Sequence, residues 1–295
     1  MPILSIRHVT TYRYQQPVAF GAHRMMLRPR DDGDQTVLES EIQITPRPKR
    51  VTWTRDDFGN HVATAQFVDR AAELSFLSTV WLDHATADFR ATAIADYART
   101  YPFAYAAEDW LILKRFVRPP LRRRELDRWS TKFFPADGSP ETHTILVAMT
   151  KTLHRTFSHR PRHEHGIQSP VDTINLGSGS CRDLAMLMIA VLRSRGLAAR
   201  FVSGYLHLPD DEEEHLAGGN THAWVQVYVP GPGWVDLDPT TGSVGNQNLV
   251  RVAVVHDPRA AIPLQGTWYG RESDHLAMKV AVKVRAAAKA GQREF

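Results

Sequence analysis

The 295-residue sequence predicts an α+β protein with a β-sandwich-like N-terminal domain and a core in which a helix packs on an antiparallel sheet. Before residue 86, short runs alternate apolar and polar residues, which is the pattern of half-buried strands. Residues 181–195 instead repeat apolar residues at the spacing of one buried helix face. After Gly196, which we expect to end that helix, strand patterns return. Hydrophobic residues make up 43% and charged residues 23% of the chain, as in globular proteins with a substantial core.

The predicted N-terminal domain covers residues 1–85. Leu38, Ile42 and Ile44 alternate with polar neighbours, and a second alternating run ends at Leu82. The sequence Asp-Asp-Phe-Gly-Asn at 56–60 is typical of a turn. Several short strands at this spacing favour a β-sandwich-like domain.

Residues 86–285 are predicted to form the core with a helical lead-in. Helical segments are expected in 86–130, and Ser139 followed by Pro140 predicts the start of a helix that runs to about Phe157. Residues 158–180 are polar and contain glycine and proline, which predicts a loop before the helix at 181–195. The expected strands of the core are 199–208, 221–229, 233–238, 250–256 and 275–284. The end, 286–295, is predicted to be a flexible tail.

Charge and targeting patterns exclude some classes of function. The net charge is only +4, and the densest arginine stretch, 118–128, also contains Glu125 and Asp127, so no nucleic-acid partner is expected. The first residues show no basic start with a long apolar run, and no segment approaches the roughly 20 apolar residues that span a bilayer. With one cysteine and no intramolecular disulfide, the chain is expected to be cytoplasmic, without a membrane partner.

Cys181, the single cysteine, lies in Gly-Ser-Gly-Ser-Cys-Arg-Asp at 177–183, where the predicted helix begins. A lone cysteine is most often a small buried apolar residue. At a helix N-terminus, however, the helix dipole favours the thiolate, and the free N–H groups can hold an oxyanion. Forty-one residues later, His222 in Thr-His-Ala-Trp could take the thiol proton. Asp236 and Asp238 are the nearest carboxylates that could orient this histidine.

Four blocks, in this order, resemble the transglutaminase-like core, a papain-like group of Cys-His-Asp enzymes. They are Gly-Ser-Cys-Arg-Asp before a helix, Arg-Phe-Val-Ser-Gly-Tyr at 200–205, His-Ala-Trp-Val-Gln-Val-Tyr, and Gly-Trp-Val-Asp-Leu-Asp-Pro-Thr. The resemblance covers about residues 140–245, and the first 85 residues resemble the β-domain that precedes this core in bacterial members. It implies that Cys181, His222 and Asp238 form a catalytic triad.

Strand register gives separate support for Asp238 as the acid. Strands 221–229 and 233–238 flank a Pro-Gly-Pro-Gly turn and should pair as a hairpin. His222 then lies opposite about residue 241, whereas Asp236 lies opposite the region of Val227 and is several ångströms too far from His222.

Other residues near these blocks are further candidates. Asn175 is a candidate oxyanion donor, and Tyr205 and Trp224 are candidate substrate-lining residues. Bacterial members of the family usually have an aromatic residue where this chain has Thr-Phe-Ser-His at 156–159. The surrounding loop 154–165 contains His154, His159, His163 and His165. It could line the cleft or bind a metal, but His-x-His without a cysteine is a weak ligand pattern, so neither a metal nor another cofactor is expected.

The sequence therefore predicts a thiol hydrolase that cleaves a peptide or isopeptide amide through a Cys181 thioester, with a peptide or protein amide as its partner. An acyltransferase that passes the acyl group to an amine and crosslinks proteins is an alternative, because the acyl-enzyme is the same. Hydrolysis is favoured because no extra barrel domains or calcium-loop pattern are present. The other alternative is a non-catalytic binding module on the same fold. Oligomeric state and substrate identity stay open.

Overall fold

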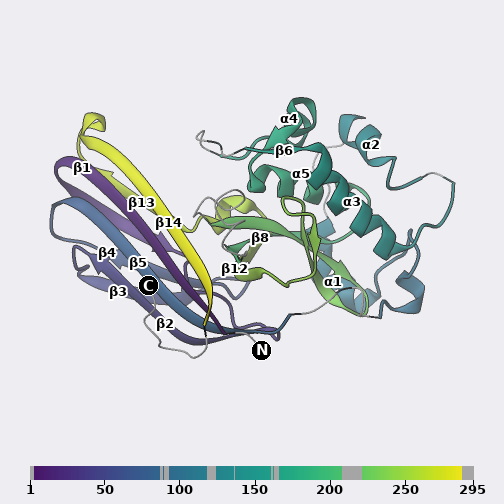
Figure 1. The fold of residues 1–295 in the computed structure, drawn as a ribbon, viewed down its shortest axis with the longest axis horizontal. Helices are drawn as coiled ribbons and strands as arrows, with labels where there is room; N and C mark the ends of the chain where they lie inside the picture. The colour runs from purple at the N-terminus through teal and green to yellow at the C-terminus, as the bar shows by residue number, and fades with distance from the viewer. Residues whose placement is uncertain are drawn as a thin grey trace.

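The computed structural model describes residues 3–86, 89, 93–117, 124–135, 137–160, 162, 166–207 and 221–287. The described residues form two large antiparallel sheets, one two-stranded parallel sheet and a layer of helices. In Figure 1 the N-terminal sheet lies on the left and the helices on the right, with strands β8 and β12 between them. The sheet that contains β8 and β12 thus lies between the helices and the N-terminal sheet.

The larger sheet is built around one long strand, β1. Its strands are β1 (Ile3–Met25), β2 (Gln35–Thr45), β3 (Arg50–Arg55), β4 (His61–Gln66), β5 (Ala71–His84), β13 (Leu264–Tyr269) and β14 (His275–Ala287). The first half of β1 pairs with β5 and β14, and its second half pairs with β4 and β13. The register shifts between Arg13 and Val18, where the two halves of the sheet separate.

The two halves of this sheet pack against each other. Phe20 and Met25 from the second half of β1 share one buried cluster with Leu74 and Phe76 from β5. The predicted turn at 56–60 joins β3 to β4, with Gly59 in the left-handed region at a φ of 76°. The predicted α+β class, with a β-sandwich-like N-terminal part, is confirmed.

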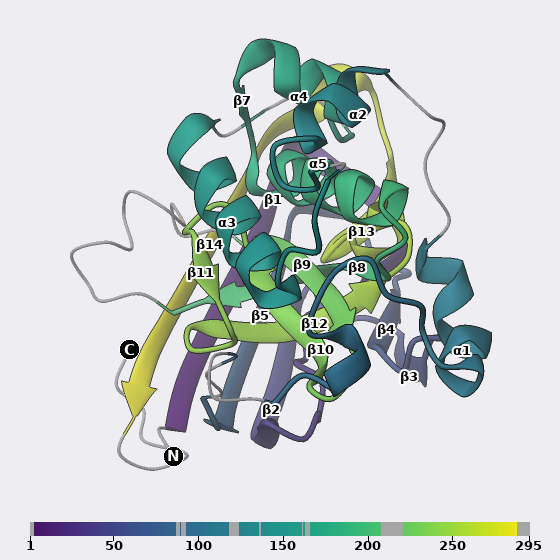
Figure 2. The ribbon, with the colours of Figure 1, turned by 90° about the vertical axis from the view of Figure 1, so that its right-hand side faces the viewer.

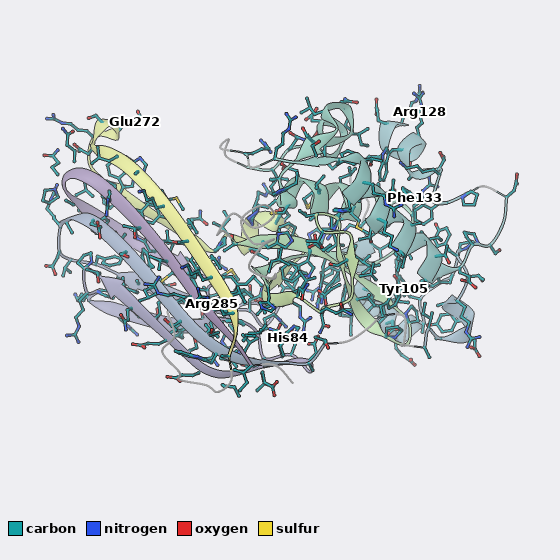
Figure 3. The ribbon with its side chains drawn as sticks, viewed as in Figure 1. His84, Tyr105, Arg128, Phe133, Glu272 and Arg285 are labelled. Atoms are coloured by element: carbon teal, nitrogen blue, oxygen red, sulfur yellow. The ribbon has the colours of Figure 1, made fainter. Side chains whose placement is uncertain are left out.

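The predicted domain boundaries need one correction. β13 and β14 lie within the range assigned to the core, but both pair with β1. Ile3 lies opposite Ala287, so residues 286–287 belong to β14 and not to a tail, while 288–295 lie outside the described residues. Glu272 and Arg285 in Figure 3 show how far the C-terminal segment extends along the N-terminal sheet. Alternation in sequence predicts a strand but not its partner, which is why the error arose.

The core sheet has the strand order β11-β10-β9-β8-β12. Its strands are β8 (Ala199–Leu206), β9 (His222–Val229), β10 (Gly233–Asp238), β11 (Ser243–Val244) and β12 (Leu249–Val255). The predicted strands at 199–208, 221–229, 233–238 and 250–256 are confirmed within two residues at each end.

Helices cover one face of the core sheet, as Figure 2 shows. They are α1 (Ala107–Val117), α2 (Arg124–Ser130), α3 (Thr142–Thr156), α4 (Pro170–Leu176) and α5 (Cys181–Ser194). Leu184, Leu187 and Val191 of α5 share the main core with Ala223 and Val225 of β9. Among the described residues, none of the helices has the length and apolar character that crossing a membrane requires.

Two helix boundaries differ from those predicted. α3 begins at Thr142, and Glu141 occupies the N-cap position instead of Ser139. The predicted loop 158–180 contains α4 and two short strands, β6 (Ser158–His159) and β7 (Ser178–Gly179). Ser169 caps α4 by accepting from the backbone N–H of Asp172, and Pro170 is its first residue. The pair Ser169-Pro170 is a pattern that predicts a helix start. The polar residues, glycine and proline of 158–180 led to the prediction of a loop instead.

Polar contacts join the N-terminal part to β12. The Gln35 side chain donates to the carbonyl of Arg251 and accepts from its backbone N–H, at 2.8 and 3.0 Å. The Asn60 side chain makes the same pair of contacts with Val254, and His84 lies 3.1 Å from the carbonyl of Leu249. Figure 3 shows His84 where the two parts meet. Because these groups satisfy the outer edge of β12, the core sheet has a fixed position against the N-terminal sheet.

Candidate active site

A tight backbone arrangement holds Cys181 at the first position of α5. Gly177 ends α4 at a φ of 61°, and Ser180 is the N-cap of α5. The Ser180 hydroxyl accepts from the backbone N–H of Asp183, and the Asp183 carboxylate accepts from the backbone N–H of Ser180. Cys181 as a whole residue is half-buried.

Asp183 connects this turn to the segment before it. Its buried carboxylate also accepts from the backbone N–H of Gln168 at 2.7 Å and from the guanidinium of Arg162 at 3.0 Å. A Cβ on Gly179 would lie 2.8 Å from the Cβ of Asp183, so only glycine fits there without a shift. The Asp183 carboxylate therefore holds the turn that precedes α5, and Asp183 is structural in this position.

His222 and Asp238 lie buried beside this turn. His222 Nε2 lies 2.8 Å from Asp238 Oδ2, and the two residues are 3% and 0% exposed. The backbone N–H of Thr240 and the hydroxyl of Thr241 also donate to the Asp238 carboxylate, each at 2.8 Å. Because Nε2 is taken by Asp238, Nδ1 is the ring nitrogen left for the thiol.

The thiol of Cys181 has two histidine partners, His159 and His222. Burial raises the pKa of the thiol, but hydrogen bonds and charge from the two imidazoles outweigh burial and lower its pKa to about 6. For His222, burial lowers the pKa, while the charge and hydrogen bond of Asp238 and the contact with Cys181 raise it to about 10. At neutral pH this arrangement favours a thiolate beside a protonated imidazole.

Asp236 does not contact His222. It accepts from the indole Nε1 of Trp224 at 2.6 Å and pairs with the guanidinium of Arg251 at 3.0 Å. In the β9–β10 hairpin Asp236 lies opposite Gln226, one residue from the predicted register. The choice of Asp238 over Asp236 as the partner of His222 therefore agrees with the structure.

Comparisons with known proteins identify both parts of the chain. Residues 4–83 match the bacterial transglutaminase-like N-terminal region, and residues 136–239 match the transglutaminase-like superfamily. The chain belongs to the transglutaminase-like superfamily. The family expected from the sequence blocks is confirmed.

Relatives of this transglutaminase-like chain include proteins of little-known activity. An uncharacterized protein of Mycobacterium tuberculosis is 27% identical over 95% of this chain and 91% of its own length. A protein-glutamine gamma-glutamyltransferase of Pseudomonas aeruginosa is 30% identical, over 41% of this chain and 21% of its own length. A solved structure from Cytophaga hutchinsonii, described as a candidate cysteine protease, has a TM-score of 0.71, 20% identity and coverage of 97% and 91% of the two chains. That structure shows the same fold.

The structure of this transglutaminase-like core places the three candidate oxyanion or substrate-lining residues in different surroundings. Asn175 is exposed on α4, and within the described residues no hydrogen bond joins it to the site. Tyr205 is 1% exposed, and its hydroxyl donates to the carbonyl of Leu27 at the contact with the N-terminal sheet. Trp224 is 0% exposed and stacks on His222, with ring centroids 6.0 Å apart. Tyr205 and Trp224 are therefore packing residues, because neither is accessible to a substrate.

The histidine-rich segment divides between two roles. His154 on α3 bonds the carbonyl of Thr240 through Nδ1 at 2.7 Å, whereas His159 contacts the thiol. His163 and His165 lie outside the described residues. Where side chains are described, no group of three or more His, Cys, Asp or Glu is arranged to hold a metal ion. Sequence reasoning recognised the segment but missed the contact of His159, because only the β6–β7 pairing brings the two together.

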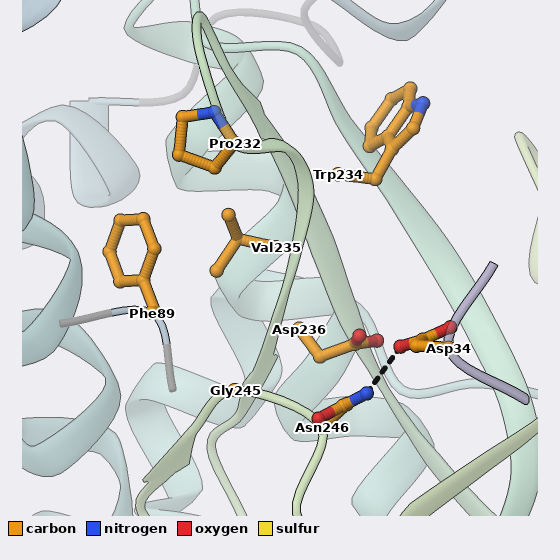
Figure 4. Close-up of a pocket in the computed structure, with 8 residues that line it drawn as sticks. All are labelled: Asp34, Phe89, Pro232, Trp234, Val235, Asp236, Gly245 and Asn246. Atoms are coloured by element: carbon orange, nitrogen blue, oxygen red, sulfur yellow. Dashed lines mark hydrogen bonds between the residues drawn. The ribbon is translucent and has the colours of Figure 1, made fainter. Parts of the chain in front are cut away.

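Two cavities lie away from the thiol. One of about 90 Å³ is lined by Asp34, Phe89, Trp234 and Asp236 among others, and Figure 4 shows Asn246 bonded to Asp34 at its edge. A cavity of about 380 Å³ lies between residues 166–170, Met186 of α5 and residues 256–259. Cys181, His222 and Asp238 line neither of these two cavities.

Proposed function

We propose that this protein is a thiol hydrolase that cleaves an amide bond of a peptide or protein through a thioester on Cys181. The observation that carries the proposal is the contact of the thiol of half-buried Cys181 at the start of α5 with His222, whose other ring nitrogen is held by Asp238. Nucleophile, base and orienting acid are the three parts of a Cys-His-Asp triad.

The chemistry follows from these positions. The thiol proton passes to His222 Nδ1, and the thiolate attacks the carbonyl carbon of the amide. The protonated His222 then gives its proton to the departing nitrogen as the carbon–nitrogen bond breaks, leaving an acyl group on sulfur. Water, deprotonated by His222, attacks the thioester, and the thiolate leaves to complete the cycle.

The start of α5 supplies charge stabilisation for this reaction. The first N–H groups of a helix have no partner within the helix. Those of Cys181 and Arg182 therefore fit the oxyanion that forms on the carbonyl oxygen, and the helix dipole favours its negative charge.

A panel of peptide p-nitroanilides tests the proposal. The wild-type protein should release nitroaniline and carry an acyl mass on Cys181 when the reaction is quenched, whereas Cys181→Ala should do neither while keeping its circular dichroism spectrum. Because the chain has one cysteine, the adduct can be assigned without ambiguity. Turnover that persists in Cys181→Ala would exclude this function.

Acyl transfer to an amine is the second candidate, favoured by the similarity to the Pseudomonas aeruginosa gamma-glutamyltransferase. Both reactions share the thioester and differ in whether water or an amine attacks it. Adding a primary diamine and weighing the products separates them: hydrolysis gives the free acid, and transfer gives the new amide. A predominant amide product would assign the protein to the transferases.

A non-catalytic binding module is the remaining alternative, and thiol reactivity distinguishes it. An inert fold should leave Cys181 no more reactive toward iodoacetamide at neutral pH than a free thiol. The cytoplasmic location and the absence of a cofactor requirement stay predictions from the sequence.

A further inference from the structure

The segment that carries His159 is registered against the nucleophile turn. β6 and β7 form a two-residue parallel ladder in which His159 lies opposite Gly179. The backbone N–H of Ser158 donates to the carbonyl of Gly177, and that of Arg160 donates to the carbonyl of Gly179, each at 2.9 Å. Backbone hydrogen bonds on both sides of His159 therefore hold it opposite Gly179, which precedes Cys181 by two residues in the sequence.

The two imidazoles at the thiol have different surroundings. His222 is buried and its Nε2 is occupied by Asp238. His159 is half-buried, and within the described part of the chain no carboxylate bonds it. One histidine is thus paired with a buried acid, while the other is partly exposed to solvent.

The charged groups around the thiol come from four elements. His159 lies on β6, His222 on β9 and its partner Asp238 on β10, while α5 contributes Arg182 and Asp183. Arg182 donates to the carbonyl of Ala261, and Asp183 is paired with Arg162. β7, which faces His159, contributes only serine and glycine. His159 is therefore a partner of the thiol that does not depend on the His222–Asp238 pair.

We propose that His159 is a second catalytic histidine, which donates an N–H to the sulfur of Cys181 and stabilises the thiolate separately from His222. This inference rests on the proposed function, in which Cys181 is the nucleophile. His159 transfers no proton in the cycle: the thiol proton goes to His222, and His159 keeps its N–H on the sulfur while negative charge is present. The same hydrogen bond assists when the thiolate leaves the thioester.

The division of roles predicts different behaviour for the two histidines. Without His222 the proton donor for the leaving nitrogen is lost, so turnover stops, but the thiolate keeps one partner. Without His159 the proton donor stays, but the thiolate forms only at higher pH. A residue that served packing alone would change stability and leave the pH at which the thiol ionises unaltered.

The rate of iodoacetamide alkylation of the full-length protein between pH 4 and pH 10 tests the proposal, because Cys181 is the only thiol. His159→Phe should raise the midpoint by about one pH unit, which makes alkylation about tenfold slower below the midpoint. His159→Gln keeps an N–H donor without the charge and should fall between. His222→Ala should retain a midpoint below that of a free thiol. Ser158→Ala, at the exposed neighbouring position on β6, should match the wild type.

The acidic limb of kcat/KM should move upward in His159→Phe by the same amount as the alkylation midpoint. An unchanged midpoint in folded His159→Phe, or in His159→Gln if the phenylalanine variant does not fold, overturns the role of His159. A wild-type midpoint equal to that of a free thiol would instead count against the proposed thiolate mechanism, so the two failures are distinguishable.

Discussion

Asp236 and Asp238 lie two residues apart on β10, and both are buried, yet their side chains belong to two different polar regions. Asp238 lies in the candidate active site, and Asp236 lies in the network that contacts the N-terminal part. Asp238 faces a partner that can titrate, His222, and accepts two further hydrogen bonds from the loop that follows the strand. Asp236 faces a permanently charged partner, Arg251, together with the indole of Trp224.

The two regions differ in whether the partner of the aspartate can gain and lose a proton: His222 can, and Arg251 does not. The charge of Asp238 raises the pKa of His222, so the imidazole can hold a proton taken from a neighbouring group. Arg251 also pairs with Asp32 and Asp34 of the N-terminal part, so the network around Asp236 joins the two parts of the chain. Burial and residue type alone therefore do not distinguish the acid that contacts His222 from the acid that pairs with Arg251.

Asp238→Asn should have the largest effect on rate. The amide carries no charge to support a protonated His222 and can favour the wrong tautomer, so kcat should fall by about 10³- to 10⁴-fold. Steady-state kinetics on folded protein measures this. A loss of less than tenfold would mean that another group orients His222.

Asp236→Asn should affect stability more than rate. Removing the carboxylate deprives buried Arg251 of one partner while Asp32 and Asp34 stay, so the free energy of unfolding should drop by about 2 kcal/mol. Urea denaturation measures the drop, and kcat should stay within a few-fold of wild type. If Asp236→Asn were slower than Asp238→Asn, with both folded, the comparison of the two acids would be reversed.

The two regions should also differ in pH dependence. The pKa of Cys181 is lowered to about 6, so kcat/KM should rise with pH through that value as the thiolate forms. The pKa of His222 is raised to about 10, so kcat/KM should fall above it as the proton donor is lost. Both limbs should persist in Asp236→Asn, because Arg251 does not titrate in this range. A limb that disappeared in that variant would connect the Asp236 network to the chemistry.

His154→Leu should have the smallest effect. The substitution removes a hydrogen bond to the carbonyl of Thr240, in the loop that donates to Asp238. We expect about a threefold loss in kcat, the scale of one ordinary hydrogen bond. Thr241→Val, which removes a direct donor to Asp238, is the matched comparison and should cost at least as much. No change in either variant would show that the loop is held by its backbone alone.

The sequence predicted the structure best where the residues that determine a feature lie close together in the sequence. The hairpin between β9 and β10 has a tight turn, so its register could be predicted to one residue and Asp238 chosen over Asp236. The helix bearing Cys181 was predicted from the glycines before it and the apolar spacing within it, and the structure adds Ser180 as its N-cap.

Long-range pairing accounts for what the sequence did not predict. The β6–β7 ladder joins segments twenty residues apart through two residues each, and no periodicity marks so short a contact. The return of β13 and β14 to β1 is equally invisible in local patterns. Tyr205 was a candidate substrate-lining residue because it follows Gly204 on a strand near the core, but its hydroxyl donates to the carbonyl of Leu27, which is far away in sequence.

The pairing of both β5 and β13 with β1 constrains the segment of chain between these two strands. The chain leaves the N-terminal sheet after β5 and re-enters it at β13, so everything between is a closed loop whose two ends are fixed on one strand. While the N-terminal sheet stays folded, the fixed ends limit the conformational entropy that the segment between them can gain by opening locally. The constraint therefore opposes local opening of this segment but, unlike a disulfide bond, does not persist when the N-terminal sheet itself unfolds.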